Sequence, residues 1–222
     1  MIKLPLVIDD VIEKRLQNEI EDIMFDCKWE YYYDINSTNY KIDYRKFLSP
    51  FQYDVSPAII TNILSEVNSE IYNVLLSPVK NIFDKINFDV DEISRFFGCI
   101  YTYMQNGKKP DCGAHVDNII PHLVLVYYVN DCEGGETILY DKTIDDIPID
   151  IKCYPDEYCD LNVKHRIIHK KGRVLVFDGK FYHAGSASKN VNRCVLNFNL
   201  FGKFKDGSYE FINPKKKIFN YR

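Results

Sequence analysis

The 222-residue sequence lacks a long uninterrupted hydrophobic run. None of its apolar stretches approaches the roughly 20 residues that a helix needs to cross a bilayer, so we expect no membrane segment. The stretch from Met1 to Asp9 has one basic residue and an apolar run too short and too soon interrupted for a secretory signal peptide. These absences favour a cytoplasmic protein.

Paired cysteine motifs and a strong excess of one charge are also missing. The seven cysteines are odd in number and form no Cys-x-x-Cys pair, which indicates reduced thiols, again as in a cytoplasm. The net charge is −4, with both signs mixed along the chain, so nucleic acid is not an expected partner. The one basic cluster, Lys215 to Lys217 with Arg222 beyond it, is interpreted as a solvated tail.

Aromatic residues, in contrast, are abundant. The 17 Tyr and 14 Phe favour strands over a helix bundle. A chain of this length can bury one substantial core, and neither an internal repeat nor a low-complexity segment divides it. We therefore expect a single β-rich domain over residues 1–222.

The N-terminal part shows helical periodicity in two places. Asp10 and Glu13 have capping-box spacing before a run with helical apolar spacing, which predicts a helix over 10–26. Ser56-Pro57 precedes a second such run, which predicts a helix that continues to Leu75 and ends or kinks at Pro78. Residues 28–55 have no clean period, so we expect short strands and loops there.

From about residue 93 the apolar period changes to two, which is typical of strands. Glycine-containing turns separate these runs and favour a sandwich or a jelly roll. The acidic segment 141–165 fits neither period, and we interpret it as a loop or lid beside the site. The predicted strands cover 93–104, 123–129, 137–140, 174–177 and 195–201.

A group of residues that could bind a metal follows from the spacing within these strands. His115 and Asp117 are two residues apart, so on an extended strand both side chains share one face. His183 ends another strand-like run, and two imidazoles with one carboxylate form the set that binds Fe(II) while leaving its other face open. Arg193, ten residues further on, could hold the carboxylate of an organic co-substrate.

Each histidine taken alone is more often structural, and His-x-Asp is a weak signal without this order and context. His122 is interpreted as structural. His165 and His169 would be ligand-like on a helix, but the β-branched residues between them favour a strand. On a strand they lie about 13 Å apart, so we do not expect them to be ligands.

The segment from about Arg95 to Phe204 resembles the prolyl-4-hydroxylase-type group of Fe(II)- and 2-oxoglutarate-dependent oxygenases. The N-terminal half is similar only in outline. The matching residues are Tyr103, His115-Val-Asp117-Asn118, Val126 to Asn130, Gly134-Gly-Glu-Thr137, Gly172 to Asp178, His183 to Ser186 and Arg193.

The resemblance implies a mostly β (α+β) fold, a double-stranded β-helix of the jelly-roll or cupin-like kind braced by N-terminal helices. Residues 1–92 would form a mixed support region, 93–204 the core, and 205–222 a C-terminal strand and basic tail.

The resemblance also implies roles for single residues. His115, Asp117 and His183 would ligate Fe(II), and Arg193 would pair with the distal carboxylate of 2-oxoglutarate, where many prolyl hydroxylases use Lys. Tyr103 and Tyr128 would line the co-substrate pocket, although ordinary strand packing explains both equally well. Tyr127 competes with Tyr128, because alternation lets only one face inward. Cys112 departs from the pattern, since relatives often have Tyr there.

The implied reaction hydroxylates a C–H bond and releases succinate and CO₂, with Fe(II), 2-oxoglutarate and O₂ required and ascorbate an optional addition. A peptide, a protein, including a prolyl residue in one, or a small molecule could be the substrate. Two alternatives stay open: an oxidative demethylase of nucleic acids, which the acidic balance disfavours, and a non-catalytic metal-binding jelly-roll module. No pattern indicates the oligomeric state, and loops 30–55 and 141–165 are expected to decide the substrate.

Overall fold

The computed structural model describes residues 2–26, 30–32, 58–62, 80–101, 114–147, 161–186 and 188–212. One helix, α1 (Lys14–Asp26), precedes most of the strands, and residues 80–85 form a short helical segment. The strands are β1 (Leu6–Ile8), β2 (Glu30–Tyr32), β3 (Ala58–Asn62), β4 (Phe88–Tyr101), β5 (Leu123–Tyr128), β6 (Thr137–Thr143), β7 (Val163–Ile167), β8 (Val174–Asp178), β9 (Phe181–Gly185), β10 (Arg193–Phe204) and β11 (Glu210–Phe211).

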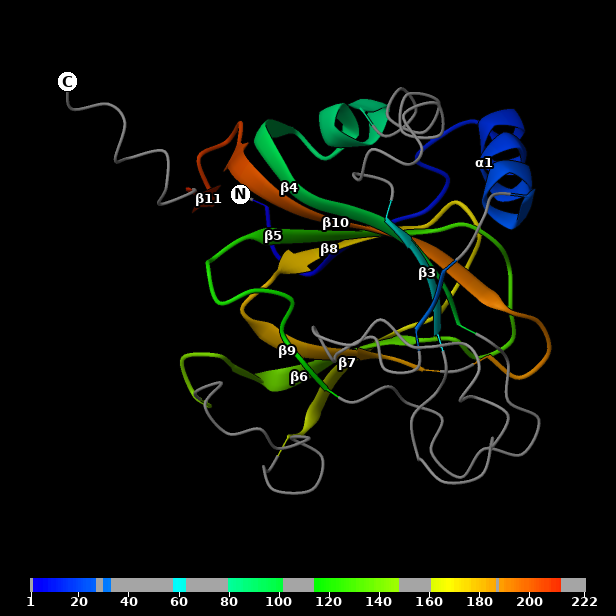
Figure 1. Ribbon diagram of the computed structural model, residues 1–222. Coiled ribbons are helices and arrows are strands. Elements are labelled where there is room, and N and C mark those ends of the chain that lie inside the picture. The colour runs from blue at the N-terminus through cyan, green and yellow to red at the C-terminus, as the bar shows by residue number, and fades with distance from the viewer. Residues whose placement is uncertain are drawn as a thin grey trace.

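The strands form two antiparallel sheets that face each other as two layers (Figure 1). The larger sheet has the order β1-β8-β5-β10-β4-β3-β2, and β11 pairs with β10. The smaller sheet has the order β7-β6-β9. Both α1 and the segment 80–85 lie on the outer side of the larger sheet (Figure 1).

Alternation along the strands of the larger sheet divides the core into two. On the outer face, Leu196, Phe198 and Leu200 of β10 are fully buried in the same cluster as Ile20 and Met24 of α1. The rings of Phe96 and Phe198 stack there with centroids 4.1 Å apart. Each fully buried side chain of this size contributes about 1.5–3 kcal/mol, so this cluster fixes the helices on the sheet.

The inner face of the larger sheet looks toward the smaller sheet. Its apolar part contains residues of β4, β5, β8 and β10 together with Leu139 of β6. On β10, however, the same face also presents Arg193 and Asn199, both buried. Polar groups enclosed between two sheets need partners, so the inner layer is where a functional site is expected.

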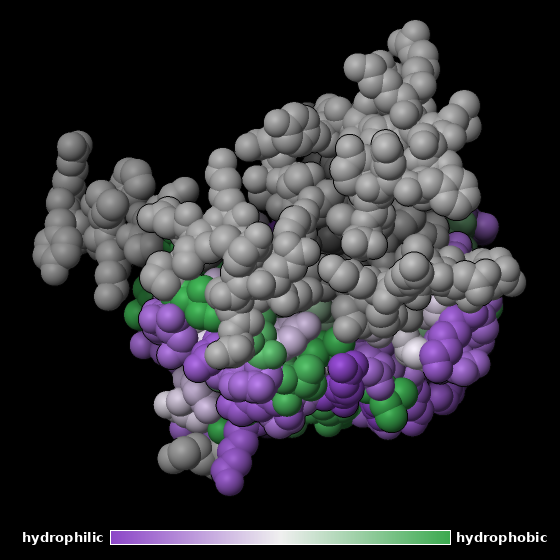
Figure 2. Space-filling model, turned by 90° about the horizontal axis from the view of Figure 1, so that it is seen from below, coloured by the Kyte–Doolittle hydropathy of each residue, from purple (hydrophilic) through white to green (hydrophobic). Residues whose placement is uncertain are grey.

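On the other side of the smaller sheet, Ile138 and Tyr140 of β6 and Tyr182 and Ala184 of β9 are buried in a third apolar cluster, whereas β7 is largely exposed to solvent. The first four residues of β7 are exposed, and Ile167 alone is buried. Figure 2, which views the molecule from below, shows a mainly hydrophilic described surface with scattered apolar residues. Among the described residues, no helix combines the length and the apolar character that crossing a membrane requires.

The strands predicted from residues 123, 137, 174 and 195 are confirmed, with bounds that differ by up to three residues. The strand predicted from residue 93 begins earlier, at Phe88, because its first half pairs with the end of β10. The segment 141–165 is less of a loop than predicted, because residues 141–143 belong to β6 and 163–165 to β7.

The second predicted helix is wrong where it can be compared. Residues 58–62 form β3, which pairs with β4 from Ala58 opposite Tyr101 to Asn62 opposite Phe97. The apolar spacing is compatible with a helix, but Ile59, Ile60 and Thr61 are β-branched and suit a paired strand better. Residues 63–79, with Pro78, lie outside the described residues.

The first helix is confirmed, but its predicted start is wrong. It begins at Lys14, and the backbone N–H of Gln17 donates to the Glu13 carbonyl at 3.0 Å. Asp10 has a left-handed backbone with a φ of 50°, and its carboxylate accepts hydrogen bonds from the side chains of Lys14 and Gln17. Asp10 therefore braces the first turn from outside instead of capping it.

Asp9 joins the N-terminal segment to the turn before β8. Its carboxylate accepts hydrogen bonds from Lys170 Nζ at 2.8 Å and from Arg173 Nε at 2.6 Å and Nη2 at 3.1 Å. These bonds, that from Arg173 foremost, hold the pKa of Asp9 well below its ordinary value. The ionised carboxylate is therefore stabilised in the folded state.

Replacing Asp9 by Asn should lower the free energy of unfolding by about 1 kcal/mol at neutral pH, because water screens a side chain that is 38% exposed. A depressed pKa stabilises the fold in full above the ordinary carboxyl pKa of 3.8, and this stabilisation is lost progressively as the pH falls from there toward the pKa of the folded state. The difference between wild type and Asp9→Asn should therefore shrink as the pH falls below that value. Urea unfolding at pH 7 and pH 3 measures it, with Asp22→Asn on the exposed side of α1 as the control.

Candidate metal centre

Two backbone segments meet at the β9 edge of the smaller sheet and bring the predicted ligands together. His183 lies in the middle of β9, not at its end as predicted, and pairs with Leu139 of β6 on one side. On the other side it forms an isolated β-bridge with His115, in which each backbone N–H donates to the other residue's carbonyl at 2.9 Å. His115 and Asp117 are thus not in a regular strand, and Asp117 lies in a bend after the bridge.

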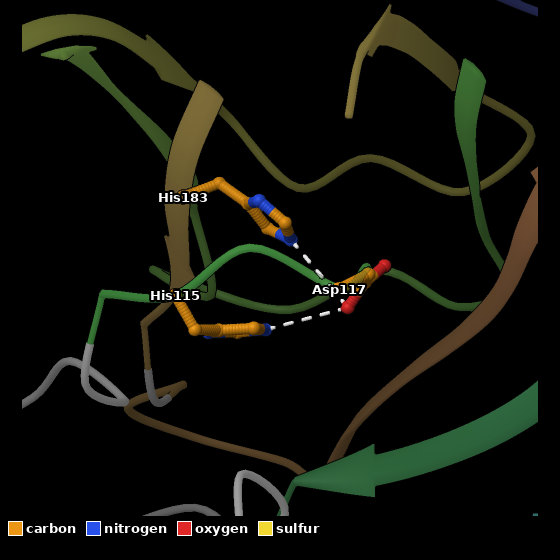
Figure 3. Close-up of side chains that lie close together, drawn as sticks. All are labelled: His115, Asp117 and His183. Atoms are coloured by element: carbon orange, nitrogen blue, oxygen red, sulfur yellow. Dashed lines mark ion pairs between the residues drawn. The ribbon is translucent and has the colours of Figure 1, made fainter. Parts of the chain in front are cut away.

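The three side chains converge as Figure 3 shows, with both imidazoles directed at the carboxylate of Asp117. Asp117 Oδ1 lies 3.6 Å from His115 Nε2 and 3.9 Å from His183 Nε2. One potential ligand atom from each residue lies within 4.8 Å of the others. One cation can therefore contact all three.

Neighbouring groups orient the ligands. His183 Nδ1 lies 3.1 Å from the Phe181 carbonyl, which favours the proton on Nδ1 and leaves the Nε2 lone pair facing Asp117. The amide of Asn199, in the orientation that satisfies both its oxygen and its nitrogen, donates to Asp117 Oδ2 at 3.0 Å. Arg95 Nη1 donates to the other oxygen, Oδ1, at 3.4 Å.

The charge states suit metal binding. Burial raises the pKa of Asp117, but the hydrogen bond with His115 and the charges of His183, His115 and Arg95 outweigh it and hold that pKa below its ordinary value. Burial, with a contribution from His115, lowers the pKa of His183 to about 4. An ionised carboxylate and a neutral imidazole are the forms that bind a metal, so neither needs to lose a proton at neutral pH.

Arg193, at the start of β10, lies in a cradle of small residues. Its Nη2 donates to Thr137 Oγ1 at 3.1 Å, and its guanidinium carbon lies 4.6 Å from the ring centre of Tyr101. A Cβ added to Gly185 would lie 2.7 Å from Arg193 Nη1, and one added to Gly135 would lie 3.0 Å from Arg193 Cδ. Glycine at both positions thus makes room for a guanidinium that is 2% exposed.

The Arg193 guanidinium contacts β9 two residues beyond the metal ligand His183. Gly185, which contacts Arg193, follows His183 by two residues on β9, so the two positions share a face about 6.7 Å apart. An extended five-carbon dicarboxylate has a comparable length. The space between the sheets therefore suits a molecule that binds a metal at one end and a guanidinium at the other.

The choice between Tyr127 and Tyr128 is settled in favour of Tyr128 as the inward residue. The Tyr128 hydroxyl donates to Thr137 Oγ1 at 2.8 Å, the same atom that Arg193 contacts. Burial raises the pKa of Tyr128 to about 12, so the phenol keeps its proton. Tyr127 belongs to the outer cluster, and Tyr103 and Cys112 lie outside the described residues.

The remaining histidines are separate from the metal-binding group, as expected. His122 is buried, with Nδ1 2.7 Å from the Ile120 carbonyl. His165 is exposed on β7, whereas His169 follows the end of that strand and packs its ring against Tyr128 with centroids 4.8 Å apart. Burial, followed by the charge of Arg193, lowers the pKa of His169 to about 3, which keeps it neutral.

Sequence reasoning missed the partners of the ligands, Arg95 and Asn199, and the hydrogen bonds of Thr137. A signal for Asn199 was present, because it lies six residues, an even number, after Arg193 and so shares its face if one strand contains both, as β10 does. Arg95 could not be placed in this way, because a β-bulge in β4 changes the alternation just before it.

Solved structures with the same two-sheet arrangement match most of this chain. A prolyl hydroxylase from Trichoplax adhaerens, solved with a peptide fragment of the hypoxia-inducible factor oxygen degradation domain, is 14% identical with a TM-score of 0.56, over 88% of this chain and 82% of its own. This chain has the double-stranded β-helix fold of the Fe(II)/2-oxoglutarate oxygenases. The predicted fold class is confirmed, and the resemblance seen in the sequence extends to the structure.

Two further solved structures with this fold are named for other activities. A 2-oxoglutarate-Fe(II) oxygenase-family oxidoreductase from Burkholderia pseudomallei is 12% identical with a TM-score of 0.56, over 91% of this chain and 84% of its own. The α-ketoglutarate-dependent epimerase SnoN from nogalamycin biosynthesis is 7% identical with a TM-score of 0.56, over 88% and 76%. No protein-family model matches the sequence, and no curated protein matches it significantly. The named reactions differ, so the fold alone does not give the substrate.

Replacing Gly185 by Ala should force Arg193 out of its cradle and lower the free energy of unfolding by about 1–3 kcal/mol, because the new Cβ would overlap Nη1. Urea unfolding measures this cost. In the Arg193→Met background, Gly185→Ala should lower the free energy of unfolding by less, because Nη1 is absent. An equal cost in both backgrounds would show that the contact with Arg193 is not the cause.

Proposed function

We propose that this protein is an Fe(II)- and 2-oxoglutarate-dependent oxygenase that hydroxylates a C–H bond of its substrate. The observation that carries the proposal is that His115, Asp117 and His183 bring ligand atoms within 4.8 Å of one another. The buried Arg193 contacts the same strand at Gly185, two residues after His183. A structural zinc site would need a fourth protein ligand, and within the part of the chain that the structure describes the metal-binding group has three.

The donor set supports Fe(II) as the metal. Two imidazoles and one carboxylate on one side of the ion leave its other positions open to small molecules. Accessibility agrees, because the side chains of Asp117 and His183 are 4% and 7% exposed, whereas those of His115 and Arg95 are 26% and 42% exposed. Co-substrate and substrate would therefore approach the metal from the side of His115 and Arg95.

The inner layer supports 2-oxoglutarate as the co-substrate. Arg193 would hold the distal carboxylate with Thr137 and Tyr128, which already form one hydrogen-bonded group. The opposite end would reach the metal. When bound, Fe(II) would supply the oxidising chemistry that consumes 2-oxoglutarate and O₂ and releases succinate, CO₂ and the hydroxylated substrate. The residues named here would hold the two ends of the co-substrate. Ascorbate would serve as an optional reductant.

A peptidyl or protein side chain is the proposed substrate, with proline as the first candidate. The sequence resemblance to prolyl-4-hydroxylases supports this, and the similar Trichoplax hydroxylase was solved with a peptide bound. The acidic net charge disfavours nucleic acid as the substrate. Tyr103 is proposed to line the co-substrate pocket with Tyr128.

We place the protein in the cytoplasm as a single domain over residues 1–222. The odd cysteine count without paired motifs supports a reducing compartment. Cys132 carries a free thiol, and burial raises its pKa to about 11, so it stays protonated and unreactive.

Replacing His183 by Ala should abolish both metal binding and succinate formation, because two ligands cannot hold the ion against water. Calorimetry with Mn(II) measures the first, and anaerobic protein supplied with Fe(II), 2-oxoglutarate, O₂ and a library of proline-containing peptides measures the second. His165→Ala, at an exposed histidine of β7, is the matched control and should behave as wild type. Undiminished Mn(II) affinity in His183→Ala would refute the site.

Replacing Arg193 by Met should weaken 2-oxoglutarate binding to the Mn(II)-loaded protein by about 100-fold, as expected for loss of a buried charge-assisted bidentate pair. Arg193→Lys should keep part of the affinity, because the charge remains while the fork is lost. Mn(II) affinity in the absence of 2-oxoglutarate should not change in either variant. Succinate carries the same distal carboxylate, so its affinity for the Mn(II)-loaded variants should fall by a similar factor.

A further inference from the structure

Arg95 is a cation that contacts the metal-binding carboxylate itself. Its Nη1 donates to Asp117 Oδ1 at 3.4 Å, and Oδ1 is also the oxygen that both histidines approach. A metal bound by all three ligands would therefore share this oxygen with a guanidinium. The two positive groups cannot be independent of each other at such separations.

The backbone aims Arg95 inward by a specific irregularity. The pairing of β4 with β10 shifts register between Asn199 and Leu200, so that Ser94 is an extra residue between Ile93 and Arg95. Ile93 therefore packs against the outer cluster while Arg95 faces the inner layer. Ser94 Oγ donates to the Asn199 carbonyl at 2.9 Å and holds the bulge in place.

The Asp117 carboxylate is held in place next to Arg95. Asn199, directly opposite Arg95 in the register, donates to the second oxygen of Asp117 at 3.0 Å. Asp117 is 4% exposed, so water screens the contact poorly, whereas the 42% exposed Arg95 lies on the open side. Arg95 therefore senses the net charge of the centre directly.

That net charge falls as the site fills. A divalent cation bound to one carboxylate and two neutral imidazoles leaves one net positive charge, which repels the Arg95 guanidinium. A dicarboxylate dianion would pair its distal carboxylate with Arg193 and bring its other carboxylate to the metal, which cancels this positive charge. Arg95 thus opposes the metal-only state but not the state that holds both molecules.

We propose that Arg95 is a positioning residue that couples metal binding to co-substrate binding, so that the metal is held tightly only when a dicarboxylate is present. This inference rests on the proposed function, because it takes the metal and the dicarboxylate from it. By linkage, the factor by which 2-oxoglutarate tightens the metal is also the factor by which the metal tightens 2-oxoglutarate. Part of this factor would come from direct contact between 2-oxoglutarate and the metal, and the charge of Arg95 would increase it.

The experiment compares Mn(II) affinity with and without saturating 2-oxoglutarate, measured by calorimetry on the full chain without O₂. Arg95→Met keeps the length of the side chain and removes its charge; Arg95→Lys keeps the charge. In Arg95→Met, Mn(II) alone should bind about tenfold more tightly, and the gain from 2-oxoglutarate should fall by about tenfold or more. Arg95→Lys should stay close to wild type.

Arg15→Met, at an exposed position of α1, is the control for loss of one positive charge from the whole molecule. Circular dichroism and thermal unfolding should show that Arg95→Met is folded, as expected for a partly exposed side chain. Equal coupling in wild type and Arg95→Met, or weaker binding of Mn(II) alone in Arg95→Met, would overturn the inference. Absence of Mn(II) binding by wild type would instead overturn the proposed function.

Discussion

The alternation of side chains along β10 is the constraint on which the rest of this structure depends. Its even-numbered residues from Cys194 to Leu200 form the centre of the outer core, which carries α1. The odd-numbered residues face inward and supply Arg193 at one end and Asn199 at the other. Because β10 is paired on both sides, with β4 and β5, neither set can shift without breaking a ladder of hydrogen bonds.

The sequence predicted the parts of the site that follow from local pattern. Strand periodicity located β5, β8 and β10, and the order of His115, Asp117, His183 and Arg193 identified the residues that the structure brings together. The inward position of Tyr128 was left open, since alternation alone does not say which face of a strand is buried inside. β3 was missed because the apolar spacing of its residues is also compatible with a helix. The strand with which it pairs, β4, is remote in sequence, so local pattern did not reveal the pairing.

The contacts of Asp117 show why the rest could not be read from the sequence. Arg95 reaches the carboxylate because one bulge changes the alternation of side chains along β4, and Asn199 reaches it from the position opposite Arg95 on β10. Both are products of long-range pairing. The same pairing encloses charged groups between two sheets, where each must be balanced by a neighbour, and this makes the inner layer polar at a cost in stability that the outer apolar core offsets.

The bridge between His115 and His183 has a consequence for how the site assembles. Two backbone hydrogen bonds attach the segment that begins at residue 114 to β9, whereas β9 itself is held in a ladder with β6. A metal ion bound by His115 and Asp117 of this segment and by His183 of β9 would cross-link the segment to the sheet. Loading the metal would then be a local folding step, visible as slower exchange of the amide hydrogens of residues 115–118 while those in β5 and β10 keep their rates.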